Sequence, residues 1–339
     1  METKEIYDKQ VWEDYVLDLR HNTSFFHSWN WGDFEKSLGK TVNRVGFYKN
    51  NQLVAVAQLV EVKAKRGKFL HIRNGPFMYW KETKLVESVT TELKNIAKLR
   101  NCDFIRLSPQ IEYSDKNEKL LKNNGFIKNQ MHDVDAEITW VLDLTQDLDT
   151  ILQKMRKNTR YYIRKAEKEG VKIIVSTKTS DLEEFYKIYI DTVERQKWNA
   201  YNFEYLKKEF EIFKKDDQIK IYLAEYQGKV IASSLFIYYR GEVFYHHSGS
   251  LTKFRHIPAS YLIQWQSIKN AKETGNTKYN FFGIARDDIS KHPWAGLSFF
   301  KKGFGGFEQR WVHGHDLPLK YKYWVTFLYE YFERVSRGY

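Results

Sequence analysis

The sequence repeats itself once, faintly, and this repeat restricts the possible folds more than any other feature does. Four short segments recur in the same order, each shifted by about 175 residues. The matching pairs are 51–55 with 228–232, 67–75 with 241–249, 103–107 with 279–283, and 121–126 with 299–304. A period this long does not fit a solenoid, so it predicts two copies of one domain within the 339 residues.

The second copy shows the order of elements most clearly. Its patterns predict a helix over 181–196, hairpin strands over 219–224 and 229–238, a strand over 243–248, a helix over 259–274, a strand over 279–282, and a short closing helix. The helix 259–274 is expected from apolar residues near helical spacing: Leu262, Ile263, Trp265, Ile268 and Ala271. This order predicts an α+β fold with a mixed sheet. It resembles the acyl-CoA N-acyltransferase (GNAT) fold, present twice in tandem.

The joint between the two copies is expected near residues 142–149. We therefore predict a first GNAT-like domain over 1–145 and a second over 146–317, with a C-terminal helix within 318–339 completing the first. One face of that helix is apolar and carries Trp324, Val325, Leu328, Tyr331, Phe332 and Val335. We expect this face to dock on a core. Contact with a membrane interface is the alternative.

The composition indicates a folded protein with an anionic partner. Lys and Arg number 55 against 43 Asp and Glu, which gives a net charge of +12, and aromatic residues reach 17%. This balance suits a nucleotide, a nucleic acid or an anionic membrane surface. Cys102 is the only cysteine, so an intrachain disulfide is excluded. Since no signal pattern or spanning apolar run occurs, we expect a cytoplasmic protein, and a monomer.

Several segments resemble the Fem family, the aminoacyl-tRNA-dependent transferases that build peptidoglycan cross-bridges. The most specific is 298–306 (SFFKKGFGG); others are 26–34 (FHSWNWGDF), 160–166 (RYYIRKA), 245–250 and 282–284. The family's coiled-coil hairpin is missing, so the resemblance is to its smaller type. It implies an aminoacyl-tRNA donor, an acceptor that is a peptidoglycan precursor (UDP-MurNAc-pentapeptide or lipid II), and no organic cofactor.

The resemblance also implies roles for the residues of the 298–306 segment. An amine attacks the ester carbon of the donor, and the resulting oxyanion needs a fixed positive charge or amide donors. Lys301 would stabilise this oxyanion, Phe300 would shape the pocket, and Lys302 would contact substrate. The alternative is that both lysines lie on a solvated helix face.

Residues 153–169 form a basic stretch, read as one helix between the two domains. Arg156, Arg160 and Arg164 follow each other at intervals of four residues and would share one face. Because like charges at this spacing repel, we expect the stripe to bind the phosphates of tRNA or a diphosphate. A merely solvated face is the alternative.

Other substrate contacts are implied by the resemblance alone. Arg195 aligns with a family arginine that binds a nucleotide diphosphate; a surface ion pair is the alternative. Trp31 and Tyr245 are candidate walls for the sugar or base, with a core position as the alternative. His247, a further candidate, stands where the family has a tyrosine. Further departures are Asp33 and Glu35 in place of a lysine and Ser108 in place of an aspartate, and they leave the acceptor open.

No metal site is predicted. His246 and His247 would alternate across a strand, and the segment 313–316 (HGHD) is a weak candidate.

A coenzyme A-dependent N-acyltransferase of the same fold is the rival enzyme. Its pyrophosphate loop needs a glycine pair, which 252–259 lacks. A non-catalytic RNA-binding module is the rival outside enzymes.

Overall fold

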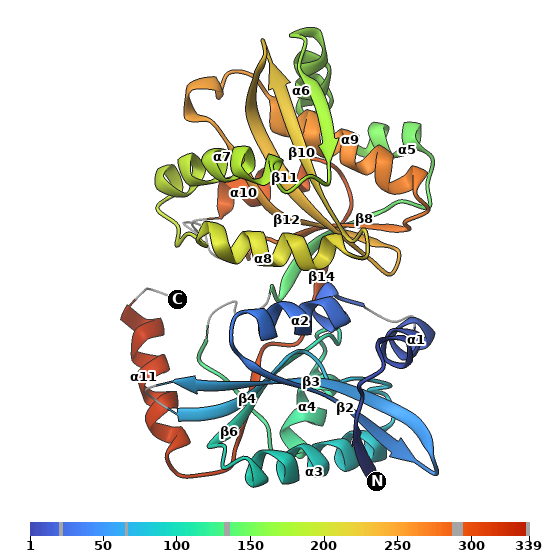
Figure 1. The fold of residues 1–339 in the computed structure, drawn as a ribbon, viewed down its shortest axis with the longest axis vertical. Coiled ribbons are helices and arrows are strands. Elements are labelled where there is room, and N and C mark those ends of the chain that lie inside the picture. Colours follow the sequence, from blue (N-terminus) through green and yellow to red (C-terminus); the bar gives the residue numbers. More distant parts are fainter. Residues whose placement is uncertain (20–22, 65–66, 132–135, 287–293, 337–339) are drawn as a thin grey trace. The chain divides into compact units, whose positions relative to one another are not determined.

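The computed structural model describes residues 1–19, 23–64, 67–131, 136–286 and 294–336 (Figure 1). The chain forms two compact units. Unit 1 comprises Met1–Glu137 together with Arg310–Tyr339, and unit 2 comprises Ile138–Gln309.

Unit 1 is built on one mixed sheet with the strand order β1-β2-β3-β4-β6-β15-β7 and with β5 paired to β3. Its strands are β1 (Glu2–Glu5), β2 (Thr41–Lys49), β3 (Gln52–Ala64), β4 (Gly67–Asn74), β5 (Phe77–Met78), β6 (Phe104–Pro109), β7 (Ile127–Lys128) and β15 (His315–Pro318). Its helices are α1 (Lys9–Leu19), α2 (Trp29–Ser37), α3 (Thr83–Leu99), α4 (Asp115–Asn123) and α11 (Tyr323–Ser336).

Unit 2 is built on a second mixed sheet, with the order β14-β8-β13-β12-β11-β10-β9. Its strands are β8 (Ile138–Asp143), β9 (Lys172–Ser176), β10 (Ile219–Tyr226), β11 (Lys229–Tyr239), β12 (Glu242–Ser250), β13 (Lys278–Gly283) and β14 (Phe307–Arg310). Its helices are α5 (Leu148–Lys154), α6 (Lys157–Lys168), α7 (Asp181–Gln196), α8 (Phe203–Lys214), α9 (Ala259–Glu273) and α10 (Ala295–Lys302).

The two sheets share one plan, as the sequence repeat predicts. In each, three antiparallel strands (β2–β3–β4 and β10–β11–β12) are followed by a crossover helix (α3 and α9) and a strand that pairs parallel to the third. The predicted helix 259–274 is α9, and all five of its marker residues are buried. The α+β class with mixed sheets is confirmed.

The units exchange one strand, which moves the boundaries from those predicted. In unit 1, β15 pairs with both β6 and β7; at the matching place in unit 2, β8 lies between β13 and β14. The chain therefore enters unit 2 at residue 138, before the predicted 146, and returns to unit 1 at residue 310, before the predicted 318. A local pattern cannot reveal this, because the choice of partner strand is a tertiary property.

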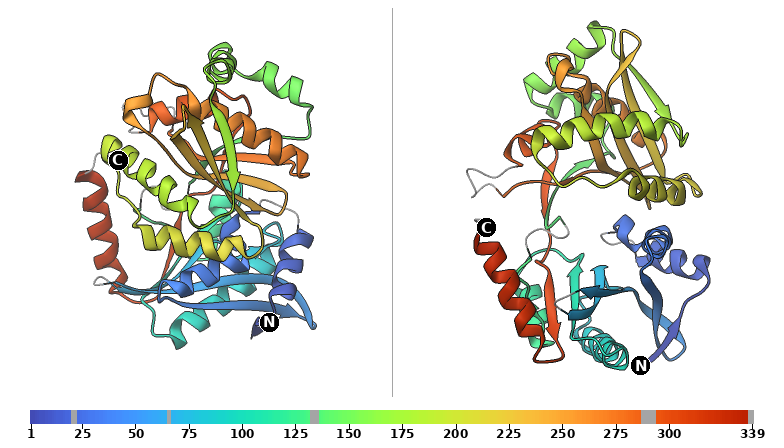
Figure 2. Two further views of the ribbon diagram at one scale, coloured as in Figure 1. Left: turned by 45° about the horizontal axis from the view of Figure 1, so that its top comes forward. Right: turned by 60° about the vertical axis from the view of Figure 1, so that its left-hand side comes forward.

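The C-terminal helix α11 docks on unit 1 in the orientation opposite to the one expected. Its buried residues are Tyr323, Thr326 and Glu330, while the apolar residues predicted to pack inward are exposed. Figure 2 shows α11, in red, running alongside β15. The contact is polar: Glu330 binds Arg106 of β6 at 3.1 and 2.7 Å. The docked face thus carries a buried carboxylate and two residues with hydroxyl groups.

Candidate functional site

The two parallel strand pairs differ in length. In unit 1, β4 and β6 stay paired over six residues, from Phe69 and Phe104 to Asn74 and Pro109. In unit 2, the pairing of β12 with β13 covers only three residues and ends at Phe244 and Asn280. A parallel pair that separates leaves backbone groups and side chains open to a ligand. Unit 2 therefore offers the opening between strands.

The separation of β12 and β13 has a local cause. The strand β13 shifts register against β8 between Asn280 and Gly283, and Phe282 takes a left-handed φ of 65°. The Asn280 side chain supports this turn, because its Oδ1 accepts a hydrogen bond from the Phe282 N–H at 2.8 Å. Its Nδ2 donates to buried Glu242 of β12 at 2.8 Å. Gly283, the last residue of β13, follows this turn.

Lys301 lies at this opening. It belongs to α10, is only 5% exposed, and its Nζ donates a 2.6 Å hydrogen bond to the Gly283 carbonyl. The same Nζ lies 5.8 Å from the ring centroid of Tyr245 on β12. Burial lowers the pKa of the Lys301 ammonium from its ordinary value to about 7. The solvated-face alternative is therefore wrong for Lys301.

Phe300 and Lys302, the neighbours of Lys301 in the motif, contact other residues. Phe300 packs on Tyr261 of α9 and on Phe304, with ring centroids 4.8 and 5.2 Å apart. The Nζ of Lys302 lies 5.4 Å from the ring of Trp140 on β8. Phe300 thus belongs to the wall between α9 and α10. Tyr245 is itself buried and donates a hydrogen bond to Ser248 at 2.6 Å.

A β-bulge in β12 brings both histidines to one carboxylate, contrary to the alternation expected. The register shifts between Leu235, paired with His247, and Phe236, paired with Tyr245, which leaves His246 as the extra residue. His246 Nε2 and His247 Nε2 lie 2.8 and 3.4 Å from the two oxygens of buried Glu209.

The cluster Glu209–His246–His247 has the composition of a metal site. Its ligand atoms lie within 4.8 Å of one another, and two imidazoles with one carboxylate suit a divalent ion such as zinc. Although burial opposes ionisation, the two histidines hold the pKa of the Glu209 carboxyl well below its usual range. Burial lowers the pKa of His247. Sequence reasoning missed this cluster because a bulge leaves no signal in the residue pattern.

Arg195 is held by its own chain. Its Nη1 donates to Asp191, the Ser250 carbonyl and Thr252 at 2.8–2.9 Å, and its Nη2 lies 3.2 Å from Thr192 and 3.3 Å from the Ser250 hydroxyl. These bonds tie α7 to the end of β12. A diphosphate would have to compete with them, so the geometry favours the ion-pair alternative.

The basic stretch is two helices rather than one. α5 ends at Lys154 and α6 begins at Lys157, so Arg156 precedes the helix and does not share the predicted face. Its guanidinium donates to the Phe299 carbonyl at 3.0 Å and stacks on the Phe299 ring. Arg160 of α6 donates to the carbonyls of Gln153 and Met155, and these hydrogen bonds link the start of α6 to the end of α5. Arg164 is exposed on α6.

The candidate residues of unit 1 come from α2 and β6. Trp31 is buried between Phe25, Phe26 and Phe34, which matches the core alternative. Asp33 pairs with Arg44 at 2.7 Å. Ser108, however, lines a pocket at the ends of β4 and β6.

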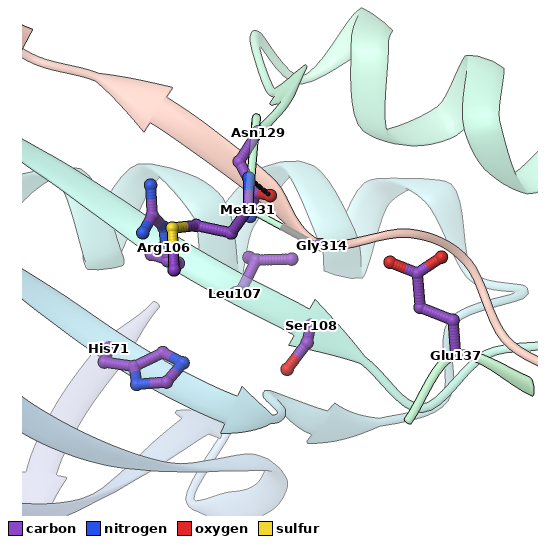
Figure 3. A pocket seen from close by; sticks show the side chains of 8 residues that line it. All are labelled: His71, Arg106, Leu107, Ser108, Asn129, Met131, Glu137 and Gly314. Atoms are coloured by element: carbon purple, nitrogen blue, oxygen red, sulfur yellow. Dashed lines mark hydrogen bonds between the residues drawn. The ribbon is translucent and has the colours of Figure 1, made fainter. Parts of the chain in front are cut away.

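Figure 3 shows His71 and Ser108 on these neighbouring strands of unit 1, with Glu137 placed across from Ser108. The pocket thus holds a carboxylate, Glu137, which pairs with His313. A second pocket of unit 1 is lined by aromatic and amide side chains, among them Tyr79, Trp80, Gln110 and Asn117. Sequence reasoning missed Glu137 and both pockets, because their residues come from separate segments.

A sequence profile of the FemAB family matches residues 8–229 and 223–330 of this chain. The UDP-N-acetylmuramoylpentapeptide-lysine N(6)-alanyltransferase of Weissella viridescens is 25% identical over 242 residues, which cover 68% of this chain and 71% of that protein. The aminoacyltransferase FemA of Staphylococcus epidermidis is 24% identical over 360 residues, covering 80% of this chain and 86% of that protein.

Solved structures agree on the fold. The crystal structure of FemX matches 97% of this chain and 100% of its own, with a TM-score of 0.86 and 18% identity. A tandem GNAT protein from the clavulanic acid biosynthesis pathway matches 94% of this chain and 98% of its own, with a TM-score of 0.58 and 8% identity. The predicted pair of GNAT-like domains is confirmed.

Proposed function

Since this chain belongs to the FemAB family, we propose that it is an aminoacyltransferase that moves an amino acid from an aminoacyl-tRNA to the stem-peptide amine of a peptidoglycan precursor. The names of the relatives support the reaction class and the acceptor class. Within the chain itself, one observation carries the proposal: a buried lysine at the place where two parallel strands separate.

The reaction needs a positive charge at one point. The acceptor nitrogen attacks the ester carbon of the donor, a C–N bond forms, and the carbonyl oxygen becomes an oxyanion. The ester C–O bond then breaks, and the ribose oxygen of the tRNA leaves and takes up a proton, while the attacking nitrogen loses one. In this proposal the Lys301 ammonium stabilises the oxyanion, and Tyr245, whose ring centroid lies 5.8 Å from the Lys301 Nζ, excludes water around it.

The burial of Lys301 suits this role. A lone ammonium in an apolar setting is costly, and here it has the Gly283 carbonyl at 2.6 Å. An oxyanion formed beside it would be a better partner than a neutral carbonyl. The interaction is therefore stronger in the transition state than in the free enzyme, which is the condition for catalysis.

The donor tRNA is proposed to contact α6. This helix carries Lys157, Arg160, Arg164, Lys165 and Lys168 over its 12 residues and buries Thr159, Ile163 and Ala166. Arg164 is exposed, whereas Arg160 is partly engaged by backbone carbonyls. Arg156 is exposed near α10, the helix of Lys301, and can meet a phosphate there.

The acceptor is proposed to be UDP-MurNAc-pentapeptide or lipid II. His247 is the remaining candidate for its contacts in unit 2, because Lys302 lies against Trp140. In unit 1, the Glu137 carboxylate in the pocket of Ser108 is the candidate for the acceptor amine, which would compete there with the imidazole of His313.

The test of this function uses mixed charged tRNAs and the UDP-linked muropeptide, with mass spectrometry of the product. We expect a mass increase equal to one amino acid residue. The increase should vanish when the tRNA is digested beforehand. A parallel reaction with acetyl-coenzyme A addresses the rival enzyme: an acetyl mass on the acceptor, with no aminoacyl product, would replace the proposed function by that rival.

A further inference from the structure

The exposed face of α11 is apolar. We define this outer face as Trp324, Val325, Leu328, Tyr331, Phe332 and Val335, which are 46, 64, 53, 40, 65 and 55% exposed. A contiguous apolar strip along one helix is uncommon on the surface of a monomer and indicates an interaction surface.

The orientation of α11 is fixed by buried charges. Arg106 of β6 binds Asp316 of β15 through two hydrogen bonds of 2.8 and 2.7 Å and binds Glu330 of α11 through two more. Tyr323 donates to Asp316 at 3.1 Å. If the helix turned to bury its outer face, Glu330 would move away from Arg106. The network would then lose both hydrogen bonds between these two residues. The fold therefore holds the apolar face outward.

The composition and charge of this face match a lipid surface. Trp, Tyr and Phe beside aliphatic residues are typical of helices that lie in the membrane interface, with cations at the edge. Lys320 and Lys322, which also pair with Asp103 at 3.4 and 3.7 Å, precede the helix, and Arg334 lies in its last turn. The net charge of +12 attracts an anionic surface and disfavours a second copy of the same chain. Among the described helices, none has the length and apolar character needed to cross a bilayer.

From these observations we infer that α11 lies in the interface of an anionic membrane, with its outer face inserted among the lipids and its charged face held by unit 1. The inference does not depend on the transfer reaction. If it is combined with the proposed function, it favours an acceptor presented at the membrane.

The test is cosedimentation with vesicles of equal parts phosphatidylglycerol and phosphatidylcholine. The outer-face variant carries Val325→Gln, Leu328→Gln and Phe332→Gln. The matched control carries Tyr7→Gln, Leu99→Gln and Tyr113→Gln, three exposed apolar or aromatic residues of the same unit. We expect the wild-type protein and the control to bind, and the outer-face variant to bind at least about tenfold more weakly. Binding should also weaken in high salt and on pure phosphatidylcholine.

A second measurement reports insertion directly. Lipids brominated near the head group should quench the fluorescence of the wild-type protein more than that of Trp324→Phe. Circular dichroism of each variant checks that the fold is kept. Transfer to the soluble muropeptide should be unchanged in the outer-face variant. A failure of the proposed function can therefore be distinguished from a failure of membrane binding.

Two results would overturn the inference. One is that the wild-type protein does not bind the anionic vesicles, or that it binds them no more tightly than the outer-face variant does. The other is a dimer in analytical ultracentrifugation that the outer-face substitutions convert to a monomer, because a second copy would then cover this face.

Discussion

The Nζ of Lys301 donates a 2.6 Å hydrogen bond to the carbonyl oxygen of Gly283, the last residue of β13. This contact ties the short helix α10 to the strand end where β12 and β13 have separated. It places a cation inside the protein at the one point where the parallel pair of unit 2 is open.

The pH dependence of transfer should report the protonation of Lys301. The pKa of its ammonium is lowered to about 7 by burial, so the charged form predominates below pH 7 and is lost as the pH rises through that value. Oxyanion stabilisation needs the charged form. We therefore expect the single-turnover rate with bound substrates to fall above neutral pH, at pH values where the acceptor amine would otherwise gain reactivity. A rate that rises through the same range would contradict a role for the charged form of Lys301.

The basic surface of α6 can be tested by salt titration of tRNA binding. Replacing Arg164 and Lys168 with Gln should reduce the slope of log K against log salt by roughly one unit per lost phosphate contact. The control is Lys214→Gln with Lys215→Gln, exposed at the end of α8. Equal slopes in both double variants would indicate that α6 is a solvated surface that does not contact the tRNA phosphates.

Arg195→Lys separates a structural role from a diphosphate contact. The guanidinium bonds to Asp191, Thr252 and the Ser250 carbonyl, and a lysine cannot reproduce this fork. We expect the free energy of unfolding to drop by about 1–3 kcal/mol. Calorimetric titration should then show equal weakening for the muropeptide with and without its nucleotide. Weakening confined to the nucleotide-linked form would instead assign Arg195 to the diphosphate.

Glu330→Ala should destabilise unit 1. The substitution leaves the Arg106 guanidinium, 6% exposed, with Asp316 as its remaining carboxylate partner in this network. Breaking a buried pair of this kind costs about 3 kcal/mol, measurable by urea denaturation. Glu333→Ala, on the same helix but partly exposed, is the control and should change stability by less than about 0.5 kcal/mol. Equal losses in the two variants would contradict the anchoring role of Arg106.

The repeated architecture could be predicted from the sequence, because each copy carries its own hydrophobic periodicity. The helix 259–274 illustrates this: its apolar spacing encodes the packing of α9 on its sheet. The strand exchange could not be predicted. β8 and β15 are short, and nothing in their residues distinguishes a partner in one unit from its counterpart in the other.

Within the site, the sequence indicated Lys301 through a motif, while the geometry around it was hidden. The left-handed Phe282 and the bulge at His246 are backbone features with no marker residue such as glycine. The orientation of α11 was misread because hydrophobic periodicity assigns the apolar face to the core. The contact that decides otherwise joins Arg106 and Glu330, which are 224 residues apart in the chain.

The role of Lys301 is tested most directly by the single-turnover rate of aminoacyl transfer by Lys301→Ala, with Lys302→Ala as the adjacent control. If the Lys301 ammonium stabilises the oxyanion, Lys301→Ala should lower this rate by about 10²–10³-fold while the Kd for aminoacyl-tRNA changes little. Lys302→Ala should keep the rate within about tenfold of the wild type, because the Lys302 side chain lies against Trp140, whereas Lys301 binds Gly283. A Lys301→Ala protein that is folded, binds the donor and transfers at a rate within tenfold of the wild type would contradict the account.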